Sequence, residues 1–286
     1  MIKSDAKGNA IVKTYALSAI VATVVAVIAR VCCLVWFYDE EIGYYTKGFV
    51  PMALNVFCFF AVAFMASGFL VTKKAKWLCD GREDNLAVKI TSVLCALAFV
   101  AFFVISVVST TFVSQSVVSD LLIKISSLMA IAYFAINLFG ANAKRSVQVL
   151  LGFGLIVWAI CILAITYFDV YVQLNSPDKI MLHLALISAM AFLVSEFRAY
   201  VIAINHRLYL FCASFAVFFL ATSTIPSLVK WIIDGMSEYK YLYYDVVLLI
   251  LLGYVTVRLL TFAFCIDKRE VENQISAEEV KTENEI

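Results

Sequence analysis

Residues 115–140 read QSVVSDLLIKISSLMAIAYFAINLFG. This apolar run is long enough to cross about 30 Å of hydrocarbon as a helix. Within it, polar residues recur at spacings of four, four and three, at Ser116, Asp120, Lys124 and Ser127. That spacing places them on one face of a helix. Because a charge inside a membrane faces protein or water rather than lipid, we expect this face to line a site.

The whole chain has the composition of a membrane protein. Its 286 residues are 64% hydrophobic and only 15% charged, and the mean hydropathy is +0.95. Soluble domains are about 45–50% apolar and about 25% charged. Seven more runs of spanning length occur, at residues 14–38, 48–72, 86–110, 147–169, 179–203, 207–233 and 241–266. The sequence therefore predicts an all-α, polytopic membrane bundle of about eight transmembrane helices.

The basic residues indicate how the bundle is oriented. With eight crossings, 15 Lys and Arg residues fall on one side of the membrane and 4 on the other. Because cytoplasmic loops carry the excess of basic residues, both termini are predicted to be cytoplasmic. Residues 1–266 form one transmembrane domain in this interpretation. Residues 267–286, which are charged and lack aromatics, are predicted to be a disordered cytoplasmic tail.

Two similar motifs suggest an internal duplication. Phe37-Tyr38-Asp39 ends the first run and Tyr167-Phe168-Asp169 ends the fifth, and a proline, Pro51 or Pro177, opens the run that follows each. Residues 1–140 and 141–266 would then be two four-helix halves, a common plan in transporters. Aromatic–acid pairs are also frequent at membrane interfaces, so an unrepeated bundle is the alternative.

Further polar residues lie in the outer parts of the runs. Arg30 can extend its stem outward toward Asp39, Glu40 or Glu41, or turn inward and join Lys124. Asp120 and Lys124 either form a self-contained i,i+4 ion pair or line a solvated vestibule. In the second case a ring of polar side chains is expected from Arg30, Asn55, Asp120, Lys124, His183 and Asp245.

A second charged pair is expected near the cytoplasmic side. Glu196 and Arg258 lie at similar depth in the sixth and eighth runs, and Arg198 is the competing partner for the acid. We interpret Glu196 and Arg258 as a structural ion pair between helices, whose disruption would be strongly destabilising.

Several kinds of chemistry lack their signatures. The two histidines, His183 and His206, fall on opposite sides of the membrane and cannot share a metal. The eight cysteines include no C-x-x-C pair, and the chain has no H-E-x-x-H, no G-x-S-x-G and no Walker loop. The sequence predicts no enzyme, no cofactor and no metal site. The net charge of +1 argues against a nucleic-acid partner.

Two loop segments carry a resemblance. Residues 38–45, YDEEIGYY, and residues 174–179, LNSPDK, resemble loops of uncharacterised bacterial multi-pass membrane proteins. The segments cover under a tenth of the chain. The resemblance implies a bacterial cell membrane and no particular activity.

Two functions fit these observations. In the first, the protein is a transporter or permease with an outward-facing polar pocket for a small, anionic solute. The residues expected to line it are Arg30, Asn55, Ser116, Asp120, Lys124, Ser127, His183 and Asp245. In the alternative, the chain is a membrane sensor or a non-catalytic subunit, and it acts through a partner membrane protein.

Overall fold

Eight long helices make up the fold. The structure, a computed structural model, describes residues 2–39, 43–46, 48–71, 85–108, 117–138, 144–169, 175–201, 206–236 and 241–264. The helices are α1 (Ile2–Trp36), α2 (Phe49–Val71), α3 (Leu86–Val108), α4 (Val117–Asn137), α5 (Arg145–Tyr167), α6 (Pro177–Val201), α7 (His206–Ile233) and α8 (Leu242–Phe264). Each is long and apolar enough to cross a membrane. The predicted all-α, eight-helix bundle is confirmed, and the chain is a multi-pass membrane protein.

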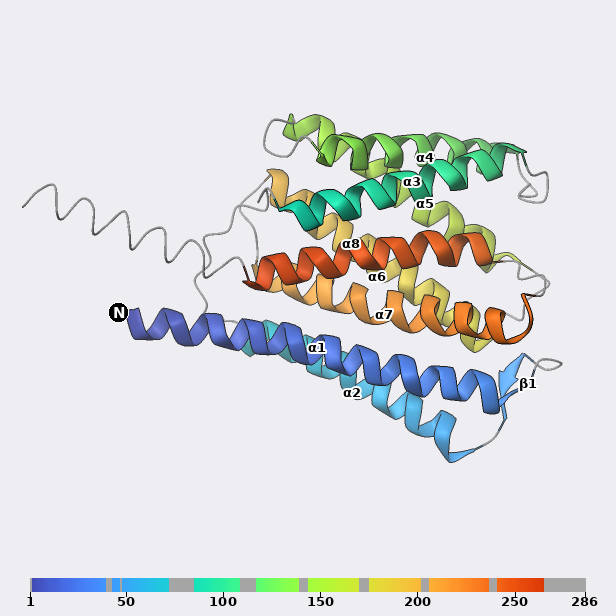
Figure 1. Ribbon diagram of the computed structural model, residues 1–286, viewed down its shortest axis with the longest axis horizontal. Coiled ribbons are helices and arrows are strands. Elements are labelled where there is room, and N and C mark those ends of the chain that lie inside the picture. Colours follow the sequence, from blue (N-terminus) through green and yellow to red (C-terminus); the bar gives the residue numbers. More distant parts are fainter. Residues whose placement is uncertain are drawn as a thin grey trace, which may run out of the picture.

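One short hairpin, not expected from the sequence, joins α1 to α2. Strand β1 (Tyr38–Asp39) pairs antiparallel with β2 (Tyr44–Tyr45), and Gly43 adopts a left-handed conformation in the turn, with φ of 71°. Figure 1 shows the hairpin at one end of the bundle and the N-terminus at the other. We call these the hairpin end and the N-terminal end. The predicted tail, residues 267–286, lies outside the described residues.

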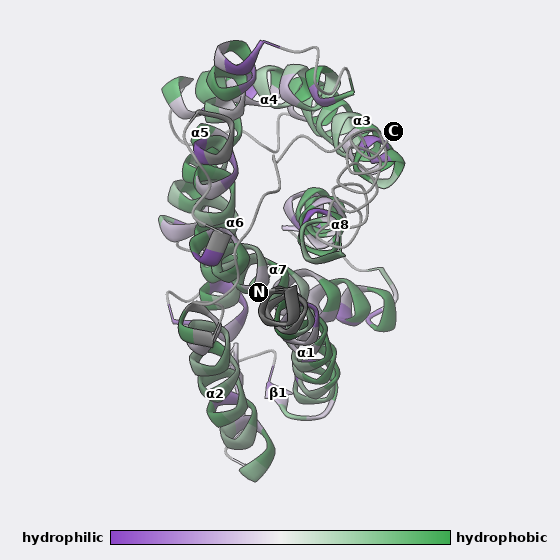
Figure 2. Ribbon diagram, turned by 90° about the vertical axis from the view of Figure 1, so that its left-hand side faces the viewer, coloured by the Kyte–Doolittle hydropathy of each residue, from purple (hydrophilic) through white to green (hydrophobic). Residues whose placement is uncertain are grey.

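Six of the helices form a closed ring. Helices α3, α4, α5, α6, α7 and α8 pack in that order, and α8 closes the ring on α3. Helix α1 packs outside the ring against α7 and α8, and α2 packs against α1 and α7 (Figure 2). The bundle therefore has an inside, which faces the ring axis, and two helices that are attached to one side of it.

Aromatic side chains fill the middle of the ring. Phe99 and Phe102 of α3 meet Trp158 of α5 at centroid distances of 5.1 and 5.6 Å. Phe134 of α4 meets Tyr254 of α8 at 5.3 Å. These contacts join helices that are not neighbours in the ring, so the side chains must cross its interior. We call Phe99, Phe102, Phe134 and Trp158 the aromatic layer.

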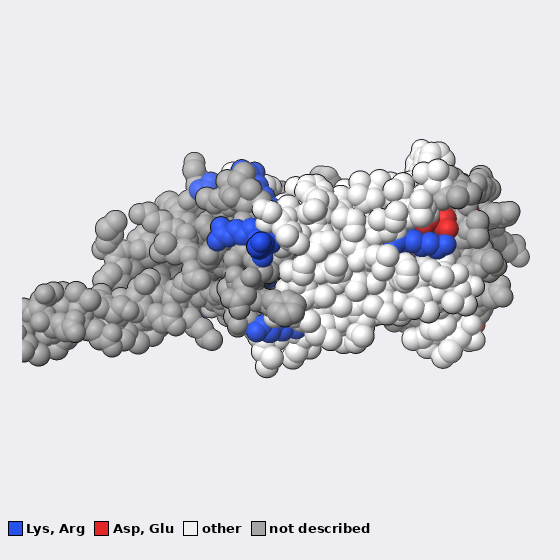
Figure 3. Space-filling view, turned by 90° about the horizontal axis from the view of Figure 1, so that it is seen from above, with Lys and Arg blue, Asp and Glu red and all other residues white. Residues whose placement is uncertain are grey.

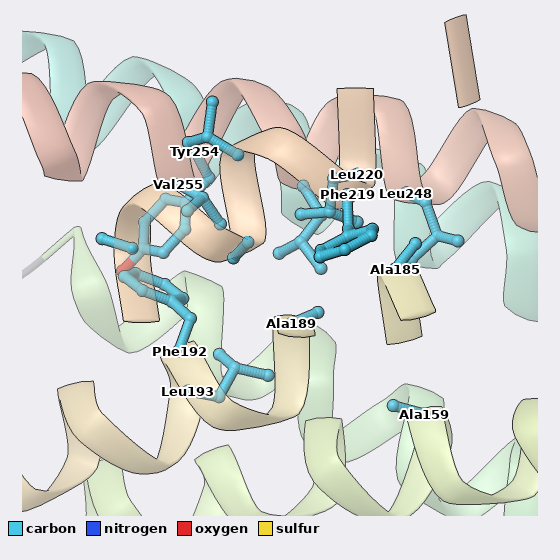
Figure 4. Close-up of a cluster of buried hydrophobic side chains, with 14 of the residues drawn as sticks. Ala159, Ala185, Ala189, Phe192, Leu193, Phe219, Leu220, Leu248, Tyr254 and Val255 are labelled. Carbon is cyan, nitrogen blue, oxygen red and sulfur yellow. The ribbon is translucent and has the colours of Figure 1, made fainter. Parts of the chain in front are cut away.

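Small residues let the central helices pack closely. Ala185 and Ala189 of α6, whose spacing of four predicts a close helix contact, are fully buried at the core that α6 shares with α7 and α8 (Figure 4). Large side chains then fill the space, among them Phe192 of α6 and Leu220 of α7. Helix α7 is the most buried span, because α1, α2, α6 and α8 all contact it.

Two glycines offer a matched test of this packing. A Cβ atom added to Gly154 of α5 would collide with the Cβ of Met129 on α4, whereas one added to Gly253 of α8 would meet no atom within 4 Å. We expect Gly154→Ala to destabilise the protein by about 1–3 kcal/mol through overpacking. Gly253→Ala should stabilise it by about 0.5–1 kcal/mol, because alanine is the better helix former. Thermal unfolding in detergent measures both, and equal effects would contradict the packing.

Candidate functional site

The stripe on α4 divides into two parts. Lys124 donates to Asp120 at 2.6 Å, and the two side chains are 29% and 25% exposed. Ser127 is buried and its hydroxyl donates to the carbonyl of Ile123 in its own helix. Ser116 lies outside the described residues. Of the two interpretations of the charged residues, the self-contained ion pair is the one present.

The ion pair lies close to the end of its helix. Asp120 is in the first turn of α4, at the hairpin end, where a carboxylate also interacts favourably with the helix dipole. Figure 3 shows basic side chains gathered toward the N-terminal end of this face, and an acidic and a basic side chain together toward the hairpin end. The partial exposure of Asp120 and Lys124 indicates that this ion pair lies near the membrane–water interface rather than at the ring axis.

We expect this pair to contribute little to stability. Exposed ion pairs are worth about 0–1 kcal/mol, since solvent and salt screen them. The double change Asp120→Asn, Lys124→Met should therefore alter the free energy of unfolding by about 1 kcal/mol or less. Thermal unfolding at low and high salt checks this, and a loss of several kcal/mol would show that the pair has a buried role.

Arg30 of α1 contacts helices α6 and α7. The side chain is 1% exposed, and its Nη2 donates to Asp178 of α6 at 2.8 Å. Its Nη1 donates to the backbone carbonyl of Thr222 in α7. The expected contact with Lys124 is wrong, because α1 packs on α7, across the bundle from α4 (Figure 2). The loop acids Glu40 and Glu41 lie outside the described residues.

A proline explains the contact with Thr222. In a regular helix the carbonyl of Thr222 would accept a hydrogen bond from the backbone N–H of residue 226. That residue is Pro226, which has no N–H. The Arg30 guanidinium therefore supplies the donor that α7 lacks. Arg30 thus joins α1, α6 and α7. The sequence signal that could have indicated this contact is Pro226, four residues after Thr222.

Asn55 is not part of any interior site. It lies on an exposed face of α2, which contacts only α1 and α7 closely and has the least buried span of the eight. The expected convergence of Asn55 with Arg30, Asp120 and Lys124 is therefore wrong. A period of 3.6 residues places a side chain on a face of its own helix, but it does not say which face the neighbours cover.

Polar side chains converge inside the ring near the hairpin end. Tyr241, just before α8, donates to the carboxylate of Asp169, just after α5, at 2.6 Å. Burial and this hydrogen bond raise the pKa of Tyr241, so its hydroxyl stays protonated. Lys179 of α6 is 1% exposed and donates to the backbone carbonyl of Asp169 at 3.0 Å. Asp245, one turn after Tyr241, is equally buried. We call these four residues the hairpin-side layer.

His183 lies beside this layer. Its Nε2 is 3.1 Å from the hydroxyl of Thr166 on α5. The start of α6 is positioned by Ser176, whose hydroxyl accepts from the backbone N–H of Lys179, and by Pro177 as the first helical residue. Of the residues expected from the sequence, His183 and Asp245 thus lie near this group, whereas Lys179 and Asp169 were not expected in it.

The structural pair predicted between α6 and α8 is present. Glu196 is fully buried, and its Oε1 accepts from the Nη2 and Nε of Arg258 at 2.8 and 2.9 Å. The hydroxyl of Tyr254 donates to the same oxygen at 2.7 Å. Helices α6 and α8 are separated by α7 in the ring, so this pair also crosses the interior.

Three further polar residues adjoin this pair and were not expected from the sequence. Tyr133 and Asn137 lie one turn apart on α4 and are buried, as is Gln148 of α5. The Gln148 amide donates to the Asn137 amide oxygen, and Tyr133 lies close to Asn137 and Tyr254. Asn137 and Gln148 are near span ends, where polar residues are ordinary. We call the group of Tyr133, Asn137, Gln148, Glu196, Tyr254 and Arg258 the amide layer.

The ring interior therefore has three levels. Along α8, the order from the hairpin end is Asp245, Tyr254 and Arg258; along α5, from the N-terminal end, it is Gln148, Trp158 and then the loop with Asp169. On α5, Trp158 of the aromatic layer therefore lies between the amide layer and the hairpin-side layer, whereas on α4 Phe134 lies at the level of the amide layer, next to Tyr133. Inside a membrane, this arrangement gives two levels of polar side chains with aromatic side chains between them.

The described residues contain no group of three or more His, Cys, Asp or Glu side chains that could hold a metal ion. The six cysteines described are free thiols. Comparisons of the chain with protein-family models, with curated proteins and with solved structures found no match. The candidate site therefore rests on its own geometry.

Proposed function

We propose that this protein is a carrier that moves a small polar solute through the six-helix ring. The observation that carries the proposal is that polar side chains from helices that are not ring neighbours meet inside the ring at two levels. Asp169 meets Tyr241 on the hairpin side of Trp158, and Glu196 meets Arg258 on the other side. Ionisable groups inside a membrane are expensive, and they mark solute or ion pathways. A barrier between two polar levels is what alternating access requires, since one compartment is open at a time.

The charge balance favours a solute without net charge. Arg30, Lys124 and Arg258 each form an ion pair with an acid. A further buried cation, Lys179, belongs to the hairpin-side layer, which also contains the acids Asp169 and Asp245. A carrier for anions would be expected to hold a surplus of positive charge on its path. This supports revising the anionic solute of the sequence interpretation to an uncharged or zwitterionic one.

The orientation is part of the same proposal. The exposed residues Lys144, Arg145 and Arg198 lie at the N-terminal end of the bundle, which supports a cytoplasmic N-terminal end and an outward-facing hairpin end. We expect a C-terminal alkaline phosphatase fusion to be inactive and a C-terminal green fluorescent protein fusion to fluoresce in a bacterial host. The opposite pattern would reverse the assignment.

Transport can be tested in proteoliposomes with a panel of candidate solutes. The panel is neutral amino acids, polyols and small amides, with carboxylates as the charged comparison. Wild type is compared with Tyr254→Phe, which keeps the aromatic ring and removes the hydroxyl that binds Glu196. We expect at least one uncharged solute to enter faster than into protein-free vesicles, and about tenfold more slowly with Tyr254→Phe, as for the loss of one good hydrogen bond.

The control variant is Asp120→Asn, Lys124→Met, which lies at the interface. It should keep the wild-type rate within about twofold, in line with the small worth of an exposed pair. If no solute of the panel enters faster than into empty vesicles, the carrier proposal fails. If Tyr254→Phe transports like wild type, the route does not pass through the ring.

A second candidate function, a subunit of a larger membrane complex, is favoured by helix α2. Its outer face exposes Phe49, Met52, Phe59 and Phe60 together with the polar Asn55. A buried asparagine between membrane helices can hydrogen-bond across an interface. Co-purification of a second chain that is lost with Asn55→Leu would support this function over the carrier.

A further inference from the structure

Three polar atoms on the α4 and α5 members of the amide layer have no hydrogen-bond partner among the residues that the structure describes. They are the hydroxyl of Tyr133, the Nδ2 of Asn137 and the Oε1 of Gln148. The side chains are 0%, 9% and 4% exposed. Buried polar groups are nearly always hydrogen-bonded, and each exception needs an explanation. Here three exceptions occur on two adjacent helices, at residues that lie against one another.

The two amides leave one donor and one acceptor whichever way they are oriented. As placed, Gln148 donates to Asn137, which leaves an N–H₂ on Asn137 and a C=O on Gln148. Turning both amides over reverses the bond and leaves a C=O on Asn137 and an N–H₂ on Gln148. A partner for the pair must therefore offer both an acceptor and a donor, and the hydroxyl of Tyr133 can serve either one.

The charges beside these atoms are balanced. Glu196 and Arg258 form an ion pair at 2.8 Å, and Tyr254 donates to the same carboxylate oxygen. A ligand with a net charge would have to leave water for a site that has no net charge to offer it. The layer therefore suits an uncharged group.

We propose that the amide layer is the binding site for the solute's carboxamide or a group with the same adjacent donor and acceptor. The proposal rests on the proposed carrier function and names the class of solute. The solute's carbonyl oxygen accepts from Asn137 and Tyr133, and its N–H donates to Gln148. The Glu196–Arg258 pair and Tyr254 line one side of the site. The aromatic layer covers its hairpin-side end.

Binding can be measured without transport, on the purified protein in detergent. The probes are propionamide, propionate and propylammonium, which match in size and differ in charge. Saturation-transfer NMR reports which probe contacts the protein, and protein-free micelles give the background. We expect propionamide to bind wild type, and the two ions to bind about tenfold more weakly.

Three variants locate the site. Asn137→Leu/Gln148→Leu removes both partners of the amide pair and should lower propionamide binding at least about tenfold. Its midpoint of thermal unfolding should stay at or above the wild-type value, because an apolar pair replaces unsatisfied polar groups. Tyr133→Phe conserves volume and should weaken binding, and it serves as the test if the double variant does not fold. Ser92→Ala, which removes a buried and equally unpartnered hydroxyl on α3, should bind like wild type.

The outcomes separate the two proposals. Equal signals from all three probes would overturn the amide site. Undiminished propionamide binding in both Asn137→Leu/Gln148→Leu and Tyr133→Phe would also overturn it. Either result is expected if only water satisfies these atoms. Propionamide binding that depends on these residues, without flux of any solute into proteoliposomes, would leave the site standing and reject the carrier. Flux that Asn137→Leu/Gln148→Leu does not change would reject the amide site and leave the carrier proposal standing.

Discussion

Glu196→Leu should destabilise the protein by about 3–5 kcal/mol, the range measured when one member of a buried ion pair is removed. The carboxylate is fully buried, and a single oxygen accepts three hydrogen bonds from Arg258 and Tyr254. Without it, the buried Arg258 guanidinium loses the counter-charge that Glu196 supplies. The midpoint of thermal unfolding in detergent, followed by intrinsic fluorescence, measures the effect.

The second half of this experiment removes the stranded charge. Glu196→Leu/Arg258→Leu should recover most of the lost stability, since an apolar pair of similar volume can replace a buried ion pair at little cost. A double-mutant cycle then gives the coupling between the two residues. Additive losses from the two single changes would contradict a direct pair and would indicate that each residue acts through other neighbours.

Arg30→Leu should lower the free energy of unfolding by about 2–3 kcal/mol, because it removes two hydrogen bonds that a buried charged group makes. One is to Asp178 at 2.8 Å, and the other is to the carbonyl of Thr222. Asp178 is 28% exposed and can be partly solvated once Arg30 is gone, so we expect a smaller loss than for Glu196.

The role assigned to the proline gives a sharper version of this test. Pro226→Ala restores the backbone N–H that the Thr222 carbonyl needs within α7. In that background Arg30→Leu should cost about 1 kcal/mol less than in wild type, the net value of one hydrogen bond. Pro226→Ala tested alone is the control for the change in the helix itself. If the loss from Arg30→Leu is the same in both backgrounds, Arg30 does not act by satisfying the Thr222 carbonyl.

The two ionic contacts differ in how readily the sequence shows them. Glu196 and Arg258 lie at similar depth in α6 and α8, which run in the same direction, so depth alone suggested the pair. Arg30 and Asp178 are 148 residues apart, and Asp178 begins a helix, where an acid is ordinary. The reason for their contact lies on a third helix, at Pro226, and it becomes visible only when α1 is known to pack on α7.

The stripe on α4 shows the limit of periodicity. Spacing correctly placed Asp120 and Lys124 on one face and paired them, but the interior site lies elsewhere. Its members, such as Lys179, Asn137 and Gln148, lie near the ends of their spans, where polarity carries little information. They become interior residues because α4, α5, α6 and α8 belong to one closed ring, so that side chains near the helix ends can face its axis.

The sequence by itself determined that this chain crosses the membrane eight times, because hydrocarbon accepts only long apolar helices and the length of each run is set by the thickness of the bilayer. The tertiary structure alone decided which helices close the ring and which of the polar residues face its interior. Without a hydrophobic force between helices in lipid, that choice depends on shape, on small residues and on polar contacts between distant spans. Those are properties of pairs of surfaces, which no single run of residues contains.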